Sequence, residues 1–295
     1  MAKIFLTAFL SPALSIFLLT VMATDVFATQ AVPEKNIALE NTSCIQCHET
    51  QNRSLIKDWQ NSAHATAEPV VDCVSCHGSL HNNMASTARH DDSCTGCHGG
   101  EKAPVAHSYA SSKHGSLMRI EKNTYDWNQP FVLANYRAPG CGYCHMYQSN
   151  HNVSSTVRHE LMNGKADNSE IEKVQDKMRQ ACQTCHAPRY ISRLFSNGEA
   201  MLEIARKKVR EAKTVIDQAE NHFNENQLTP AKQQFKKMQR HLRNVHLGIG
   251  HQSPDYQWWH GQPALDGDLL RIKDSIGELQ RLKAINESRS DAVSD

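Results

Sequence analysis

The sequence predicts a mainly α-helical protein in which loops and short helices are followed by long antiparallel helices. From residue 197 onward, apolar residues recur at spacings of three and four, which is the period of helices that pack against one another. Before that point Gly, Ser, Asn and His are frequent and one short cysteine motif is repeated, which is typical of loops and short helices.

Residues 1–28 have the features of a secretory signal peptide. Lys3 gives a positive start, residues 4–22 are mainly apolar, and Ala28 ends a small-residue cleavage site. An uncleaved inner-membrane anchor is the alternative, because the apolar run is long for a signal, but Pro12 and the serines favour cleavage. Residues 29–41 form a polar leader.

Five Cys-x-x-Cys-His motifs follow, and they contain every cysteine of the chain. The cysteines are Cys44 and Cys47, Cys73 and Cys76, Cys94 and Cys97, Cys141 and Cys144, and Cys182 and Cys185, and the motifs end in His48, His77, His98, His145 and His186. This spacing is the attachment signature of c-type haem, in which two thiols bond the porphyrin and the histidine is the proximal iron ligand. Zinc ribbons and disulfides are the alternatives, but neither requires a histidine after every second cysteine. The sequence therefore predicts five covalently bound haem c groups in a domain spanning residues 42–196.

The composition agrees with a core that is built partly from porphyrin. Hydrophobic residues make up 39% and aromatic residues 6% of the 295 residues, so residues 41–190 are expected to be largely unfolded without haem. The first cysteines of successive motifs are separated by only 29, 21, 47 and 41 residues, so neighbouring haems should approach closely and conduct electrons. The net charge of +1 gives no case for nucleic-acid binding.

Twelve of the 17 histidines remain as possible distal ligands. An iron with two imidazoles is closed and transfers electrons, whereas an iron that lacks a second strong ligand is open to substrate. From spacing and neighbours, the distal candidates are His64, His81, His114, His151 and His251, with His90, His107, His246 and His260 as the next choices. A histidine a few residues beyond its own motif should bind the iron of a neighbouring haem, because it does not reach the opposite face of its own.

The C-terminal helical domain is predicted to span residues 197–286. Its first helix carries a seam from Leu202 to Phe223, its second opens at Thr229 and Pro230, and its third begins at about Leu265. The polar residues 287–295 are expected to form a disordered tail.

Three segments resemble the hydroxylamine oxidoreductase family of octahaem cytochromes, and more distantly the pentahaem nitrite reductases. The segments are Cys94 to Pro104 with Tyr109 and Ser112-Lys113-His114-Gly115, Cys141 to Met146 with His151-Asn152-Val153, and Ser253 to Gly261. The resemblance spans about residues 73–265. It implies that Tyr256 matches a tyrosine that cross-links to the catalytic haem of a neighbouring subunit, so Tyr256 is the candidate catalytic residue and a homotrimer is an expectation.

Two departures from the family favour an electron carrier over an enzyme. The acid and base of the family fall on Lys102 and Ala103, and the unit with the catalytic haem has no clear counterpart. The first motif ends in His48, where pentahaem nitrite reductases have lysine. We therefore expect a periplasmic pentahaem carrier, whose partners are redox proteins or a quinol-oxidising membrane cytochrome. The alternative is an oxidoreductase that acts on hydroxylamine or nitrite at one open haem.

Overall fold

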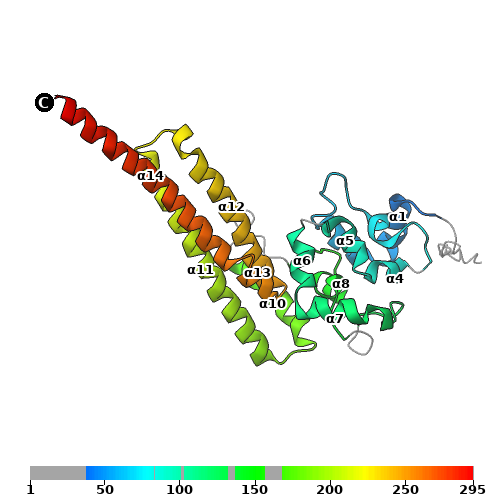
Figure 1. The fold of residues 1–295 in the computed structure, drawn as a ribbon. Helices are drawn as coiled ribbons and strands as arrows, with labels where there is room; N and C mark the ends of the chain where they lie inside the picture. The colour runs from blue at the N-terminus through cyan, green and yellow to red at the C-terminus, as the bar shows by residue number, and fades with distance from the viewer. Residues whose placement is uncertain (1–37, 83, 101–102, 132–136, 157–167, 295) are drawn as a thin grey trace, which may run out of the picture. The chain divides into compact units, whose positions relative to one another are not determined.

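The computed structural model describes residues 38–294 except 83, 101–102, 132–136 and 157–167. The expected signal peptide and all but the last residues of the polar leader lie outside these ranges. The described residues are mainly helical and include no strand beyond an isolated bridge between Ala38 and Leu80, so the mainly α prediction is confirmed (Figure 1). Within this part of the chain, no helix has the length and apolar character needed to cross a membrane.

Short helices make up the first part of the described chain. They are α1 (Asn41–Gln51), α2 (Arg53–Gln60), α3 (Cys73–His77), α4 (Met84–Arg89), α5 (Asp92–His98), α6 (Pro104–Ala110), α7 (Lys113–Glu121), η1 (Lys122–Thr124), α8 (Cys141–His145) and η2 (Tyr147–Ser149). Local capping explains several of their starts. Asp72 accepts a hydrogen bond from the Ser75 amide at 2.8 Å before α3, and Ser112 accepts one from the Gly115 amide at 3.1 Å before α7.

Long helices make up the remainder: α10 (Asn168–Gln183), α11 (Pro188–Glu220), α12 (Glu225–Gly250), the short α13 (Pro254–Trp258) and α14 (Gln262–Ser294). Helices α11, α12 and α14 lie side by side and share one apolar core (Figure 1). Leu202, Met238, Val245 and Ile272 are completely buried there. Each buried side chain of this size contributes roughly 1.5–3 kcal/mol, so this bundle supplies an apolar core of its own.

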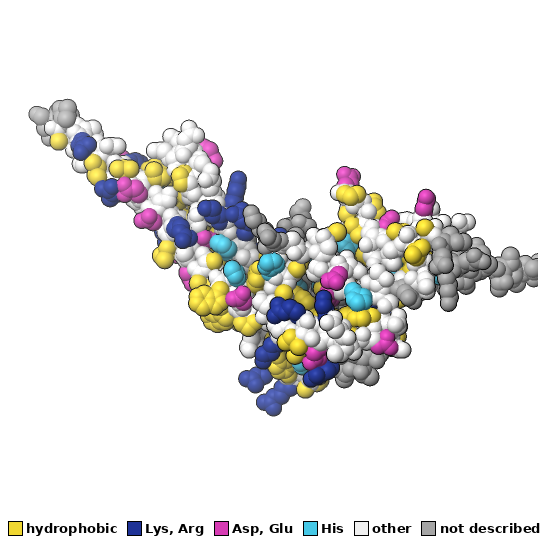
Figure 2. Space-filling model, turned by 45° about the vertical axis from the view of Figure 1, so that its right-hand side comes forward, with side chains coloured by type: hydrophobic (Ala, Val, Ile, Leu, Met, Phe, Trp, Pro, Cys, Tyr) yellow, Lys and Arg dark blue, Asp and Glu magenta, His cyan; other side chains and the backbone are white. Residues whose placement is uncertain are grey.

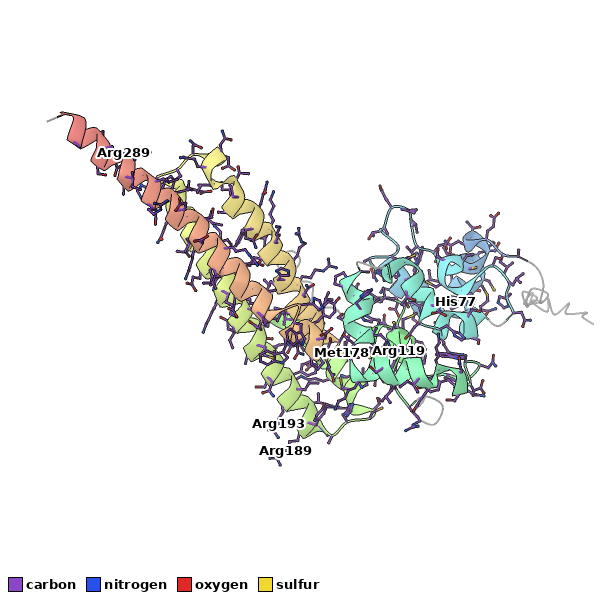
Figure 3. The ribbon with its side chains drawn as sticks, in the orientation of Figure 1. His77, Arg119, Met178, Arg189, Arg193 and Arg289 are labelled. Atoms are coloured by element: carbon purple, nitrogen blue, oxygen red, sulfur yellow. The ribbon has the colours of Figure 1, made fainter. Side chains whose placement is uncertain are left out.

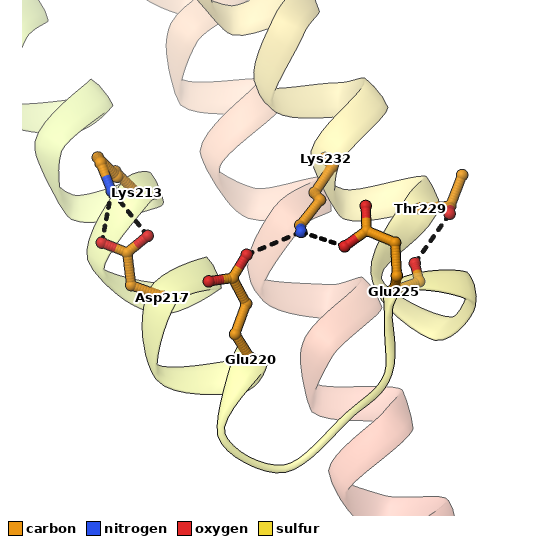
Figure 4. Close-up of polar contacts among 6 residues, drawn as sticks. All are labelled: Lys213, Asp217, Glu220, Glu225, Thr229 and Lys232. Carbon is orange, nitrogen blue, oxygen red and sulfur yellow. Dashed lines mark hydrogen bonds and ion pairs between the residues drawn. The ribbon is translucent and has the colours of Figure 1, made fainter.

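Helix α12 begins earlier than the sequence analysis predicted. Its N-cap is Asn224, whose side chain accepts from the Gln227 amide at 3.1 Å while the Gln227 side chain accepts from the Asn224 amide at 3.0 Å. Thr229 is therefore inside the helix and donates to the Glu225 carbonyl at 2.9 Å (Figure 4). Lys232 of α12 links this helix to the end of α11. It pairs with Glu220 of α11 at 2.7 Å and with Glu225 of α12 at 2.5 Å (Figure 4).

Two predicted boundaries differ from the structure. Residues 287–295 were expected to form a disordered tail, whereas α14 continues to Ser294 with no proline or glycine after Gly277 to end it and with an ion pair of 2.6 Å between Arg281 and Glu278. The expected domain boundary between residues 196 and 197 falls within α11, so one helix joins the two parts.

Candidate haem-binding site

The Cys-x-x-Cys-His motifs form single helical turns. Four of them lie within α1, α3, α5 and α8, and the fifth closes α10, where the His186 amide donates to the Cys182 carbonyl at 2.9 Å. In such a turn the cysteines at i and i+3 share one face, so both thiols reach the same ligand. No disulfide joins any of the ten cysteines, so all of them are available for thioether bonds.

One continuous cavity of about 2980 Å³ connects the five motifs. Ordinary small-molecule pockets reach about 1000 Å³, so this space is of a size for several large ligands. It is lined by all ten cysteines, by the five motif histidines and by the five distal candidates His64, His81, His114, His151 and His251. Among the next choices His246 also lines the cavity, whereas His90, His107 and His260 do not.

Four motif histidines each face a distal candidate across this cavity. The ring centres are 6.1 Å apart for His98 and His64, 6.2 Å for His77 and His151, 6.0 Å for His186 and His114, and 6.4 Å for His145 and His251. Two imidazoles that bind one metal ion from opposite sides, with bonds of about 2.0–2.1 Å, place their ring centres about 6 Å apart. The four separations therefore fit an iron between the rings of each pair.

Hydrogen bonds at Nδ1 orient several of these rings. His77 Nδ1 lies 3.0 Å from the Met84 carbonyl, His145 Nδ1 lies 3.3 Å from the Val153 carbonyl, and His151 Nδ1 lies 2.8 Å from the Ser149 carbonyl. A carbonyl only accepts, so each Nδ1 donates and carries the proton. Nε2 then keeps its lone pair for a metal, which is the usual arrangement of ligand histidines.

His251 has a hydroxyl partner instead. Its Nδ1 lies 2.7 Å from Ser108 Oγ, and the same hydroxyl donates to the Val105 carbonyl at 2.8 Å. Because the hydroxyl proton is directed to that carbonyl, Ser108 accepts from His251. Ser108 is fully buried, so this contact between α6 and the end of α12 is shielded from water.

Burial favours the neutral form of five histidines that line the cavity. Desolvation lowers the pKa of His64, His77, His114 and His145, and it lowers the pKa of His251 to about 4. Neighbouring histidines lower these pKa values further. A neutral imidazole is the form that binds a metal ion.

The motifs follow one another in space in the same order as in the sequence. The thiols of Cys44 and Cys73 interact, as do those of Cys94 and Cys141, and burial raises the pKa of Cys73 to about 11. Cys76 lies near Cys94, and Cys144 lies near Cys182. Each motif is therefore adjacent to the next.

Asp91 joins the third and fourth motifs, a role that the sequence analysis missed. Asp91 is the residue before α5, and its carboxylate accepts a hydrogen bond from the Cys141 amide at 2.7 Å. Burial raises the pKa of this carboxyl. Nothing in the sequence near Asp91 singles it out, since its partner lies 50 residues away.

The remaining histidines have different surroundings. Within the described residues, no ring contact links His48 to another imidazole, and His81 lines the cavity without one. His90 stacks on Trp127 with ring centres 4.1 Å apart, which is a packing contact. His260 lies 5.0 Å from Tyr256, ring centre to ring centre.

Tyr256, the candidate catalytic residue, lies outside the cavity lining. It is buried in α13, and its amide donates to Ser253 Oγ at 3.2 Å. Burial raises the pKa of its phenol. Ala103 precedes α6 as its N-cap, and Lys102 lies outside the described residues.

The cavity suits haem in its polar groups as well as in its size. Thr156 Oγ1 lines it and is buried without a hydrogen-bond partner among the described residues. A haem propionate would satisfy such a hydroxyl, and Lys113, Arg137 and Arg243 line the same space as possible partners for this negative charge. His77 and Met178, labelled in Figure 3, both contribute to the lining from different helices.

Haem-attachment turns that share one helical cavity define a multihaem c-type cytochrome. The chain belongs to the family described as "Seven times multi-haem cytochrome CxxCH", whose profile matches residues 12–234. It is also 23% identical over 374 aligned positions to the probable nitrite reductase-hydroxylamine oxidoreductase fusion protein of Kuenenia stuttgartiensis. That match includes 84% of this chain and 44% of the relative, so the chain spans less than half of the relative's length.

Two solved structures have a similar fold. A chain of the reducing HAO-like protein complex of Kuenenia stuttgartiensis superposes with a TM-score of 0.57 at 16% identity, over 84% of this chain and 87% of that one. A structure described as a hypothetical multiheme protein gives a TM-score of 0.54 at 15% identity, over 72% of this chain and 59% of that one. The resemblance expected from the sequence is thereby confirmed.

Proposed function

We propose that this protein is a periplasmic pentahaem cytochrome that passes electrons along five closely packed haems, most of them with two histidine ligands. The observation that carries this proposal is the single cavity, which all ten motif cysteines line and in which four motif histidines each face a second imidazole at about 6 Å. Covalently bound haem c would supply reversible one-electron chemistry at these positions.

Histidines of the chain would serve as the second ligand of four irons and so keep substrate from binding there. His64, His151, His114 and His251 would serve as the distal ligands opposite His98, His77, His186 and His145. Each of them comes from a segment outside the motif that it faces. This cross-ligation ties distant segments together and would keep neighbouring porphyrins in close contact.

The consecutive order of the motifs supports a linear path. Cysteines of each motif lie near those of the next motif, from the first motif to the fifth. Electrons would therefore pass along the haems in sequence order. Redox proteins or a quinol-oxidising membrane cytochrome would be the partners at the two ends of this path.

Residues 1–28 support export, and c-type haem is attached outside the bacterial cytoplasm. Cell fractionation followed by N-terminal sequencing tests this part of the proposal. A periplasmic protein that begins near residue 29 agrees with it, whereas a cytoplasmic protein that begins at Met1 contradicts it.

Electron paramagnetic resonance of the oxidised protein tests the proposed ligands. Haems with two imidazoles are low-spin, so at least four of the five should give low-spin ferric signals. High-spin signals from two or more haems would contradict the proposal.

His48 gives a specific reason to consider a second function. No imidazole faces it within the described residues, so the first haem is the candidate for an open iron, and His81 is the candidate that would close it. An open iron could reduce or oxidise a small nitrogen compound such as hydroxylamine or nitrite. Steady-state assays with both compounds decide between the two functions, and turnover well above that of a bis-histidine cytochrome would favour the enzyme.

A further inference from the structure

Helix α12 carries a basic face outside the haem cavity. Lys236, Lys237 and Arg240 are exposed, and α12 contains no Asp or Glu after Glu225. None of the three cations forms an ion pair within the part of the chain that the structure describes, whereas Lys232 on the same helix pairs with two glutamates. These charges are therefore free to attract a partner.

Two exposed tryptophans lie beside this basic face. Trp258 is 59% exposed and Trp259 is 77% exposed. The Asn244 side chain of α12 donates to the His260 carbonyl at 3.2 Å, which holds the segment after α13 against α12. Because Lys237, Arg240 and Asn244 follow one another at spacings of three and four, they share one side of the helix. Figure 2 shows basic, histidine and apolar side chains together on the helical part of the molecule.

The segment that carries the tryptophans also lies next to His251, the proposed ligand of the fourth haem. Gln257 of α13 donates from its side chain to the Gly248 carbonyl of α12 at 2.9 Å. Three residues further on, His251 caps α12 and faces His145 across the cavity. The segment that carries the tryptophans is therefore hydrogen-bonded to α12 close to His251, which is the proposed ligand of the fourth haem.

We propose that Trp258, Trp259, Lys236, Lys237 and Arg240 form the docking face for an acidic redox protein. An electron would pass between this partner and the haem attached at Cys141 and Cys144, with one iron reduced and the partner oxidised and with no bond made or broken. The inference rests on the proposed electron-transfer function. Specific protein interfaces are typically formed by exposed aromatic side chains that are surrounded by charged or polar residues.

Charge favours an acidic protein over other occupants of this face. Two copies of the chain related by a twofold axis would bring these cations together, and like charges across an interface oppose association. A membrane-bound amphipathic helix turns its apolar stripe outward, but on α12 that stripe, including Met238 and Val245, is completely buried in the bundle. A partner with carboxylates opposite the three cations satisfies both the charge and the aromatic surface.

The test uses the full-length haem-loaded protein and a reduced acidic [2Fe–2S] ferredoxin as the probe. The variant is Lys236→Glu/Lys237→Glu/Arg240→Glu, and Trp259→Ser tests the aromatic part. The matched control is Arg281→Glu/Lys283→Glu/Arg289→Glu, which makes the same charge change on the outer part of α14, where Arg289 is labelled in Figure 3. Stopped-flow spectrophotometry follows haem reduction at low and at high ionic strength.

We expect the α12 variant to be reduced by the ferredoxin at least about tenfold more slowly than the wild type at low salt, since steering changes association rates by about 10–1000-fold. The α14 variant should retain the wild-type rate, and Trp259→Ser should slow reduction at both salt concentrations. Equal rates for the wild type and the α12 variant would overturn the docking face.

Two further measurements distinguish a failure of the docking face from a failure of the proposed electron-transfer function. Neutral reduced lumiflavin should reduce the wild type and the α12 variant equally, and a wild type that lumiflavin does not reduce would contradict the electron-transfer function itself. Binding to sedimented anionic vesicles should be absent, and the oligomeric state in the analytical ultracentrifuge should be the same for the wild type and the α12 variant. Vesicle binding or self-association in the wild type that is lost in the α12 variant would assign the face to a membrane or to a second copy and overturn the proposal.

Discussion

At the scale of single residues, Ser108 controls the orientation of His251. Because Ser108 Oγ donates to the Val105 carbonyl, it accepts from His251 Nδ1 and leaves Nε2 to face His145. Loss of such a hydrogen-bond partner typically lowers metal affinity about 10–100-fold.

Ser108→Ala should therefore loosen the bond from His251 to its iron. We expect carbon monoxide to displace the distal ligand of one ferrous haem more readily, by about 10–100-fold in apparent affinity. Ser108→Thr, which keeps the hydroxyl, should restore the wild-type behaviour, and the exposed Ser54→Ala serves as control. Wild-type carbon monoxide binding in Ser108→Ala would contradict this role.

Removal of a distal ligand should change the spin state of one haem. His114→Ala and His251→Ala should each convert a single low-spin haem to high spin, because each ring faces one motif histidine. His107→Ala is the control, since His107 is exposed and does not line the cavity. If both variants stay wholly low-spin by absorption and paramagnetic resonance, the assignments are wrong.

At the scale of the helices, the bundle is stabilised by its buried seam. Met238 is completely buried among α11, α12 and α14, whereas Leu270 on α14 is 66% exposed. Met238→Ala should lower the free energy of unfolding of the bundle by about 2–5 kcal/mol, and Leu270→Ala should change it by less than about 0.5 kcal/mol. Urea unfolding followed by helical circular dichroism measures both, and equal midpoints would contradict this packing.

The helical seams could be predicted because their period reflects burial directly. The apolar residues of the seam from Leu202 to Phe223 were expected on a packed face, and they belong to the core or pack against it. The start of α12 was missed because Thr229-Pro230 is a strong cap signal, whereas the helix begins at the capping box of Asn224 and Gln227, whose N-cap lies five residues earlier. The helical conformation of residues 287–294 was not expected, because a polar composition at a chain end is typical of a disordered tail.

At the scale of the whole molecule, the haem cavity replaces a core in the first part of the described chain. The main apolar cluster belongs to α11, α12 and α14, and the cluster around Met118 and Tyr125 is small. Protein made without haem should therefore keep the helical bundle and lose most structure before residue 190. Hydrogen exchange should show protected amides in α11 and α12 and little protection in α1 to α8, and protection throughout would contradict this account.

The members of the candidate site could be predicted, but their pairing could not. Motif spacing identified the ten cysteines and five proximal histidines, and glycine and motif neighbours suggested His114 and His251. Which rings face each other depends on contacts between segments far apart in the chain, such as His145 with His251, and local spacing does not encode these. The same reason explains why Ser108 and Asp91 were missed, since their partners are 143 and 50 residues away.

Intact-mass spectrometry of the protein exported by a cell that attaches c-type haem tests the central claim most directly. We expect the mass of the mature chain plus five haems, and Cys97→Ala should leave the third haem held by a single thioether. A wild-type mass with four or fewer added haems would contradict a pentahaem cytochrome.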